Sequence, residues 1–344
     1  MAVITIVGAG MMGSSIGIPA AENGNEVRLV GTPLDSEIIR HAKATGEHLT
    51  LKRKLPESYR YYPFEQLNQA LAGADLLVSG VSSFGVDWFL ENVLRTLPES
   101  LPVLAVTKGM IDREDGALIP YPHYYREKLG TRHLSLNAVG GPCTSYELAD
   151  RDPTYVAFCG EHIQVLRRIK ALFETSYYNI SLSTDVIGVE CAVAMKNAYA
   201  LAVTLAVGMA QKRDGKLHYN SQAALFAQSV REMRRLLSLV GGGDENIVYG
   251  AGDLYVTVFG GRTRLIGTLL GEGLSFEKAM EKLSGVTLES IVIATRTARA
   301  VRRLIARGAV REEDFPLLLH VDEIINRGAS VEIPWKAFET ESVR

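Results

Sequence analysis

The stretch Val3–Gly17, VITIVGAGMMGSSIG, decides the fold of the N-terminal half of this chain. A run of β-branched residues leads directly into Gly8, Gly10 and Gly13, which have G-x-G-x-x-G spacing. In dinucleotide-binding folds the first glycine makes a tight turn, the second lets a pyrophosphate approach the backbone, and the third lets the helix pack on the strand. The helix N-terminus then offers N–H groups and partial positive charge to the phosphates. The stretch predicts a dinucleotide-binding strand–turn–helix unit, with a plain tight turn as the alternative.

The rest of the first half repeats this alternation. Short apolar runs are separated by amphipathic segments such as 66–73 and 164–175. The runs are AVITIVG (2–8), EVRLVG (26–31), ADLLVSGV (74–81), LPVLAVTK (101–108), HLSLNAVGG (133–141) and TYVAFCG (154–160). Near-continuous apolar strands between helices indicate a parallel sheet covered on both faces. We therefore expect an α/β Rossmann-type doubly wound sheet.

After about Thr184 only helical patterns remain. We expect helices at 186–213, 220–240, 264–271, 275–283, 288–306 and 312–326. Glycine-rich separators such as GGGDENIVYGAGD (241–253) lie between them. The sequence predicts a dinucleotide-binding domain over 1–184 and an all-helical substrate-binding and catalytic domain over 185–344.

Composition and net charge limit the class of protein and the kind of partner. The chain has 344 residues, 47% hydrophobic and 22% charged, as expected for a globular protein of two domains. Its net charge of −2 argues against a nucleic-acid partner. The basic amphipathic segment 296–311 is expected to form a solvated or subunit-facing surface, with an acidic partner as the alternative.

Cysteine usage and the N-terminus point to the cytoplasm. Cys143, Cys159 and Cys191 show no metal-ligand spacing and suggest free thiols in a reducing compartment. The histidines form no cluster, so we expect no metal. The N-terminus has no basic segment before its apolar run, unlike a signal peptide. Residues 191–210 are long enough to span a bilayer, but a lysine at membrane depth costs about 3 kcal/mol or more, so we expect a buried helix and no membrane span.

The second strand bears on the coenzyme. It ends EVRLVGTPLD, so Gly31 and Thr32 stand where a ribose-binding acid is usual, and Asp35 comes later. Such an acid selects NAD, whereas NADP is tolerated without it. Arg28 lies within the strand. The choice stays open, with a slight lean to NADP.

Polar residues follow the expected strands and helices at places suited to a ligand. Ser82, Ser83 and Lys108 come at strand ends, which face the ligand crevice of a doubly wound sheet. Asp253 follows a glycine-rich turn, with Thr257 one helical turn later. Further on, Gly260–Gly261 precede Arg262 and Arg264 at the start of a helix, an arrangement typical of an anion site and especially of phosphate. A loop with a solvated helix start is the alternative.

Lys196 stands in the middle of the small, apolar stretch VECAVAMKNAYALAVT (189–204). Its neighbours one turn away, such as Ala192 and Tyr199, are uncharged. The interpretation without a functional role is a lysine side chain that extends from one face of the helix to solvent. The functional one is a cation held inside a cleft because chemistry needs it, paired with a carboxylate such as Asp253.

Taken together, these segments resemble the NAD(P)-dependent sn-glycerol-3-phosphate dehydrogenases. The resemblance covers nearly the whole chain through GAGMMG, NGNEVRLVG, VTKG, GGPCTSYELA, DVIGVECAVAMKNAYALAV, GAGDLYVT, GGRTR and TLES. It implies reversible reduction of dihydroxyacetone phosphate to glycerol 3-phosphate with NADP or NAD, usually by a cytosolic homodimer that feeds phospholipid synthesis.

The resemblance also assigns residues. Lys196 matches the catalytic lysine, and Lys108, Asp253 and Thr257 join it around the substrate. Implied coenzyme contacts come from Gly8, Gly10, Met11, Met12, Gly13, Thr32, Ser83, Lys108, Ser145, Arg262 and Glu289. Implied substrate contacts come from Lys108, Gly141, Cys143, Lys196, Asp253, Gly261, Arg262 and Thr263.

The chain departs from the family's pattern at four positions. Thr263 replaces the asparagine of an Arg-Asn phosphate motif, Gln222 an arginine, Ser290 a glycine, and Cys143 a threonine. A related reductase of a hydroxy acid or another phosphorylated substrate is therefore the alternative function. A nucleotide-sensing protein without turnover is a third, against which the set of Lys108, Lys196, Asp253 and Thr257 argues.

Overall fold

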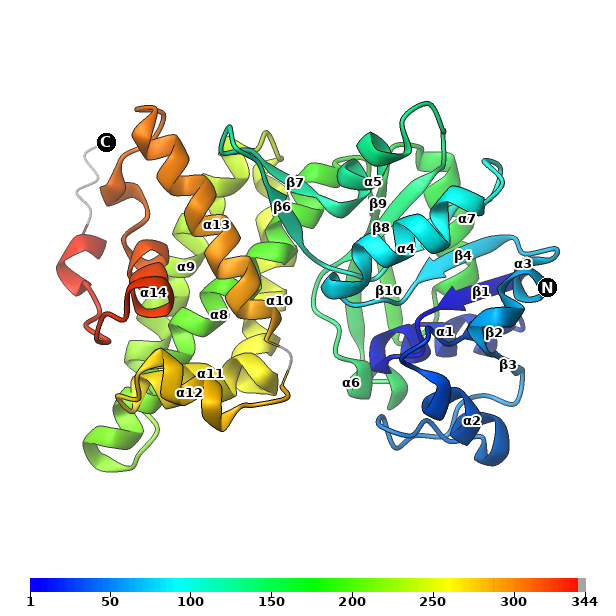
Figure 1. Cartoon of the computed structure of the whole chain (residues 1–344), viewed down its shortest axis with the longest axis horizontal. Helices are drawn as coiled ribbons and strands as arrows, with labels where there is room; N and C mark the ends of the chain where they lie inside the picture. The colour runs from blue at the N-terminus through cyan, green and yellow to red at the C-terminus, as the bar shows by residue number, and fades with distance from the viewer. Residues whose placement is uncertain (287, 340–344) are drawn as a thin grey trace. The chain divides into compact units, whose positions relative to one another are not determined.

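The computed structural model describes residues 1–286 and 288–339. Contacts within the chain divide it into two units (Figure 1). The sheet unit comprises Met1–Lys108 and Pro120–Glu190. The helical unit comprises Gly109–Ile119 and the chain from Cys191 onward. The boundary expected between 184 and 185 stays a prediction, and residues 340–344 of the second expected domain lie outside the described residues.

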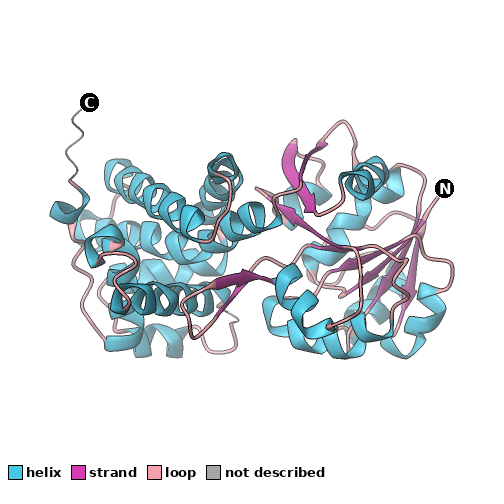
Figure 2. Cartoon of the chain, turned by 90° about the horizontal axis from the view of Figure 1, so that it is seen from above, coloured by secondary structure: helices cyan, strands magenta, loops and turns pink. Residues whose placement is uncertain are grey.

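The sheet unit is built on one eight-stranded sheet with the order β10-β9-β8-β5-β4-β1-β2-β3. Its strands are β1 (Val3–Val7), β2 (Glu26–Val30), β3 (Tyr59–Tyr62), β4 (Leu76–Ser79), β5 (Val103–Ala105), β8 (Leu136–Gly140), β9 (Thr154–Gly160) and β10 (Tyr178–Ser183). Helices cover both faces (Figure 2). They are α1 (Met11–Glu22), α2 (Ser36–Thr45), α3 (Leu67–Leu71), α4 (Val86–Asn92), α5 (Tyr121–Leu129), α6 (Ser145–Ala149) and α7 (Ile163–Phe173). The predicted doubly wound α/β class is confirmed.

One strand direction differs from the prediction. β1, β2, β3, β4, β5 and β8 pair in parallel, but β9 runs antiparallel to β8. A parallel return needs a crossover long enough to cover the sheet. The connection from β8 to β9 contains only the short helix α6, so the chain turns back beside β8.

The sequence also missed both edge strands. β3 and β10 lie at the two ends of the strand order. Their sequences, YRYY and YNISLS, alternate apolar and polar residues, because an edge strand buries less of its surface than a central one. A search for continuous apolar runs passes over such strands.

The helical unit contains the predicted helices with small shifts of their ends. They are α8 (Val186–Asp214, whose first residues belong to the sheet unit), α9 (Tyr219–Leu239), α11 (Gly261–Gly271), α12 (Phe276–Lys282), α13 (Glu289–Ala306) and α14 (Pro316–Arg327). A hairpin of β6 (Met110–Asp112) and β7 (Leu118–Pro120) was not expected and joins this unit through β6.

Helix α8 forms the core of this unit. Its length and hydropathy alone would suit a membrane span, the one such helix in the described part of the chain, but 89% of its most apolar window is buried inside the protein. Small residues let α11 approach it closely: a Cβ at Gly267 would lie 1.9 Å from Thr204 Oγ1, and one at Gly271 would lie 2.1 Å from the Leu205 carbonyl oxygen. Its small, apolar composition therefore serves helix packing.

The expectation of a glycine-rich separator at 241–253 is wrong in its second half. Ile247–Phe259 forms a helix, α10, and Asp253 lies inside it rather than after a turn. The glycine that suggested a loop has a packing role, since a Cβ at Gly250 would lie 2.5 Å from the Ala192 carbonyl oxygen of α8. Close helix contact outweighs the low helix propensity of glycine.

The basic segment 296–311 is not simply a solvated surface. Arg296 of α13 donates to the Met110 carbonyl at 3.0 Å, and Arg303 donates to Asp112 at 2.9 Å. Arg307, just after α13, donates to the Asp115 carbonyl at 3.0 Å. The segment therefore bonds the β6–β7 hairpin of the same chain, through backbone carbonyls and the Asp112 carboxylate.

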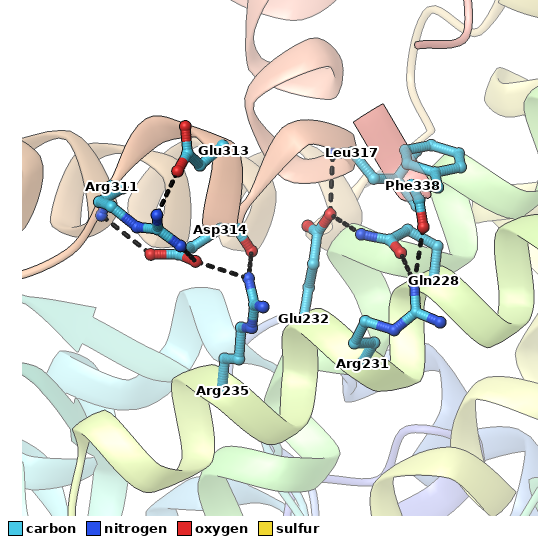
Figure 3. A network of polar contacts seen from close by, with 9 residues as sticks. All are labelled: Gln228, Arg231, Glu232, Arg235, Arg311, Glu313, Asp314, Leu317 and Phe338. Atoms are coloured by element: carbon cyan, nitrogen blue, oxygen red, sulfur yellow. Dashed lines mark hydrogen bonds and ion pairs between the residues drawn. The ribbon is translucent and has the colours of Figure 1, made fainter. Parts of the chain in front are cut away.

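A buried carboxylate joins α9 to α14 (Figure 3). Glu232 accepts hydrogen bonds from the Leu317 and Leu318 amides at 2.8 and 3.0 Å, from Gln228 at 2.8 Å and from the Tyr199 hydroxyl at 3.1 Å. The side chain thereby satisfies the first N–H groups of α14. Burial raises the pKa of Glu232 to about 7 against these hydrogen bonds.

Candidate functional site

The predicted glycine turn joins β1 to α1, and the requirement for glycine has a different cause at each of its three positions. Gly8 has φ +108°, and a Cβ there would lie 2.6 Å from the carbonyl carbon of Gly80. A Cβ at Gly13 would lie 2.2 Å from the Gly8 carbonyl oxygen. At Gly10 a Cβ would meet no described protein atom within 4 Å. Gly8 and Gly13 are therefore fixed by packing, whereas Gly10 faces open space that suits a phosphate group.

A groove of about 470 Å³ lies beside this turn. It is lined by Gly8, Gly10, Thr32, Pro33, Leu34, Asp35, Gly80, Val81, Ser82, Phe84, Gly85 and Trp88. Three predicted coenzyme contacts, Gly8, Gly10 and Thr32, are in this lining. Ser83 is the residue between Ser82 and Phe84 and begins a short 3-10 turn. Met11 and Met12 are the first residues of α1 and are half-buried.

The tip of the second strand carries Gly31 and Thr32 rather than an acid, but the later Asp35 lies beside it. Asp35 folds back so that its Oδ2 accepts from the Thr32 amide at 2.8 Å, the Thr32 hydroxyl at 2.7 Å and the Ala9 amide at 3.1 Å. The carboxylate lines the groove at the tip of β2. Arg28 points elsewhere, to Glu26 and the Ala70 and Ala72 carbonyls. Counting positions from the strand missed Asp35, although a Thr-x-x-Asp turn is a recognisable signal.

The remaining candidates of the sheet unit follow neighbouring strand ends. β1, β4, β5 and β8 are parallel neighbours, so the residues after them share one edge of the sheet. Lys108 follows β5 and donates from Nζ to the carbonyl of Gly141, which follows β8, at 2.8 Å. Cys143 is half-buried, and the Ser145 carbonyl accepts from Ser15 of α1 at 2.9 Å. The predicted strand-end residues are thus brought to a common edge.

In the helical unit, Lys196 and Asp253 form an ion pair. The Lys196 ammonium of α8 donates to Asp253 Oδ1 of α10. Only 1% of the Asp253 side chain and 14% of the Lys196 side chain are exposed. The expectation that Lys196 pairs with Asp253 is confirmed, and its extension into solvent is excluded. The Thr257 hydroxyl donates to the Asp253 carbonyl at 2.7 Å, so it lies one turn along the same helix.

The expected anion site lies at the start of α11. Gly260 is extended and Gly261 has φ +76°, a conformation that suits glycine. Arg262 is exposed, and Thr263 is buried. Arg264 donates to the Val258 carbonyl of α10 at 2.7 Å. One N–H of Arg264 is therefore used at the end of the preceding helix, and the expectation of a two-arginine anion site stays a prediction.

The structure also shows where Glu289 lies and where two of the residues that differ from the family's pattern, Ser290 and Gln222, lie. Glu289 is the first residue of α13 and Ser290 beside it is buried, whereas Thr287 of the TLES motif lies outside the described residues. Gln222 donates to the His218 carbonyl at 2.8 Å within α9. Each unit thus holds its own set of candidates, with the glycine turn and Lys108 in one and Lys196, Asp253, Arg262 and Glu289 in the other.

Comparison with known proteins matches both halves of the chain. Residues 3–165 match the profile of the NAD-dependent glycerol-3-phosphate dehydrogenase N-terminus, and residues 185–336 match that of the C-terminus of the same family. The chain is 34% identical over 334 residues to the NADP(+)-dependent glycerol-3-phosphate dehydrogenase of Archaeoglobus fulgidus, covering 96% of this chain and 97% of that protein. It is 27% identical to glycerol-3-phosphate dehydrogenase [NAD(P)+] of Myxococcus xanthus, covering 95% and 93%.

Solved structures agree on the fold. The glycerol-3-phosphate dehydrogenase of Plasmodium falciparum superposes with a TM-score of 0.83 at 21% identity, covering 100% of this chain and 96% of that one. At this identity the likeness speaks for the fold alone.

Proposed function

The chain belongs to the NAD-dependent glycerol-3-phosphate dehydrogenase family, and on this premise we propose that it reduces dihydroxyacetone phosphate reversibly to sn-glycerol 3-phosphate with NADH or NADPH. The buried Lys196–Asp253 pair carries the proposal. Burying this ion pair costs desolvation free energy, because two charges must leave water, and a purely structural role would gain little from it. A reaction that needs a cation shielded from solvent accounts for the burial of this pair.

Lys196 is the general acid of the proposed reaction. Reduction of a ketone needs a hydride for the carbon and a proton for the oxygen. When bound, the reduced nicotinamide supplies the hydride. The Lys196 ammonium stabilises the negative charge that develops on the oxygen and donates its proton there, an assistance of about 10²–10⁴-fold in rate. In the reverse direction the neutral amine accepts the alcohol proton, while Asp253 keeps Nζ in place.

The residues around the glycine turn fit a dinucleotide. The open space at Gly10 admits the pyrophosphate beside the first N–H groups of α1, at Met11, Met12 and Gly13. The other proposed coenzyme contacts are Gly8, Thr32, Ser83, Lys108, Ser145, Arg262 and Glu289. NADP and NAD are both proposed as coenzymes, in line with the names of the two relatives.

The start of α11 is the proposed phosphate site. The glycine-opened helix terminus at Gly261 and the exposed Arg262 suit a dianion. Thr263 offers a hydroxyl where the family has an amide. Lys108, Gly141 and Cys143 are proposed to contact the substrate, as are Lys196 and Asp253, with Thr257 supporting Asp253 from the next turn.

The cellular setting is proposed from the family. A cytoplasmic homodimer that feeds glycerophospholipid synthesis accords with the thiols of Cys143, Cys159 and Cys191, none of which forms a disulfide in the described chain. Sedimentation of the purified protein tests the dimer: a monomer at micromolar concentration would contradict it.

The function is tested by following oxidation of NADH and of NADPH with three ketones: dihydroxyacetone phosphate, dihydroxyacetone and a 2-keto acid. Turnover with dihydroxyacetone phosphate and little with dihydroxyacetone is expected. Turnover with the 2-keto acid alone would instead identify a reductase of another substrate. Coenzyme binding without oxidation by any ketone would identify a sensor.

A further inference from the structure

The peptide groups at Ala9, between Gly8 and Gly10, are held from two sides. The Ala9 N–H donates to Asp35 Oδ2 at 3.1 Å. The Ala9 carbonyl lies 2.8 Å from Nε2 of His48, in the loop after α2. Both partners lie outside the glycine motif, yet both bond the backbone of its second residue.

The environment of His48 decides which ring nitrogen carries hydrogen. Its Nδ1 accepts from the backbone N–H groups of Leu51 at 3.0 Å and Thr50 at 3.3 Å. An Nδ1 that accepts cannot also carry hydrogen, so Nε2 carries it and donates to the Ala9 carbonyl. The observed bonding therefore requires the neutral Nε2–H form.

The surroundings oppose protonation of this ring. His48 is fully buried, and burial lowers its pKa. Asp35 at the start of α2 acts in the opposite direction, and His41 of α2 lowers the pKa further. Arg53, whose carbonyl accepts the His48 amide at 2.9 Å, directs its guanidinium to Asp150. A proton on Nδ1 would face the two backbone donors of Thr50 and Leu51 and displace the ring.

We infer that His48 and Asp35 are positioning residues that hold the Ala9 backbone in the form that receives the coenzyme, and that protonation of His48 releases this hold and weakens coenzyme binding. The inference rests on the proposed coenzyme site. The turn needs such support, because a Cβ at Gly10 would meet no described protein atom within 4 Å and packing at that position does not fix the backbone. The fully buried His48 supplies part of the support.

Two substitutions separate the two hydrogen bonds of the ring. In His48→Gln the amide nitrogen takes the place of Nε2, which keeps a donor for Ala9 in a side chain that does not titrate. In His48→Asn the oxygen takes the place of Nδ1, which keeps the acceptor for Leu51 and loses the donor for Ala9. His41→Gln is the matched control, since His41 belongs to the same region without bonding the turn.

The experiment is calorimetric titration with NAD⁺ from about pH 5.5 to 8, with circular dichroism confirming the fold at each pH. The wild-type and His41→Gln proteins should bind NAD⁺ more weakly on the acid side, below the ordinary histidine pKa of 6.5.

The variants separate the contributions of the two side chains. At pH 7.5, His48→Asn should raise Kd about tenfold, the equivalent of one lost hydrogen bond of about 1.4 kcal/mol. His48→Gln should stay near wild type and lose the acid-side weakening. Asp35→Asn should bind about tenfold more weakly at every pH, with the acid-side weakening retained.

Three outcomes would overturn the inference: wild-type affinity in folded His48→Asn, wild-type affinity in folded Asp35→Asn, or an acid-side weakening that persists in His48→Gln. Failure of the wild-type protein to bind NAD⁺ and NADP⁺ at all would overturn the proposed function as well, so the two failures are distinguishable.

Discussion

The ammonium group of Lys196 on α8 and the carboxylate of Asp253 on α10 form a hydrogen-bonded ion pair that is almost fully withdrawn from solvent. Removal of either charge would leave the other buried without this ion pair. The pair therefore links the stability of the helical unit to the chemistry proposed for it, and substitutions must separate the two effects.

Removal of one partner should destabilise the fold. Lys196→Met leaves the buried Asp253 carboxylate without its ammonium partner, which should lower the free energy of unfolding by about 3–5 kcal/mol. The double variant Lys196→Met/Asp253→Asn should recover most of this loss, because no charge remains, while its turnover stays low. Urea unfolding and kcat of the same samples check both expectations. Recovery of turnover together with stability would show that the pair is structural only.

The three glycines of the turn should respond differently to alanine. Gly10→Ala should fold with wild-type stability, since a Cβ there meets no described atom within 4 Å, and should lose coenzyme affinity. Gly13→Ala should lower the melting temperature, since its Cβ would lie 2.2 Å from the Gly8 carbonyl oxygen. Thermal unfolding and NAD⁺ titration of this matched pair test the assignment. Unchanged NAD⁺ affinity in Gly10→Ala would place the pyrophosphate elsewhere.

Arg262 should matter far more for a phosphorylated substrate than for an unphosphorylated one. Arg262→Ala should raise KM for dihydroxyacetone phosphate at least about tenfold, since a charge-assisted hydrogen bond to phosphate is worth about 1.5–3 kcal/mol. The KM for dihydroxyacetone should change much less, and both KM values are measured at saturating coenzyme because Arg262 is also a proposed coenzyme contact. Lys282→Ala, an exposed cation at the end of α12, is the control. An equal loss for both ketones would argue against a phosphate role.

Glu232 should make stability depend on pH with a defined sign. Burial raises its pKa from the ordinary 4.5 to about 7, so the folded protein holds the proton more tightly than the unfolded chain. The contribution of this group is fully present below pH 4.5 and is lost as the pH rises through about 7. The decrease amounts to about 3 kcal/mol.

Urea unfolding from about pH 5 to 8 measures this slope. Glu232→Gln cannot ionise and should remove the component, whereas Glu277→Gln, at an exposed glutamate of α12, should keep it. The same slope in Glu232→Gln and in the wild type would assign it to other groups.

The sequence predicted those parts of the fold whose cause is local. The turn at Gly8, Gly10 and Gly13 follows from backbone geometry within one strand–helix unit, and the central strands follow from their apolar runs. Helix α10 was missed because its cause is tertiary: Gly250 is required by the approach of α8, and nothing in 241–253 shows this. The direction of β9 likewise depends on how far the connection through α6 reaches.

The candidate site was predicted to a similar extent. The pairing of Lys196 with Asp253 was expected because a lysine in an apolar helix needs a partner. The fold-back of Asp35 to Thr32 and Ala9, and the bond from His48 to the same turn, arise from loops whose course the sequence pattern does not specify. The bond from Arg264 to the Val258 carbonyl at the end of α10 was not expected either, because it depends on how α10 meets α11.

Turnover of Lys196→Ala with dihydroxyacetone phosphate, measured beside NAD⁺ affinity and with Lys212→Ala from the exposed end of α8 as control, tests the central claim most directly. We predict a kcat at least about a hundredfold below wild type, NAD⁺ affinity unchanged, and partial recovery of kcat on addition of methylammonium as a replacement acid. A folded Lys196→Ala protein that turns over near the wild-type rate would contradict the account.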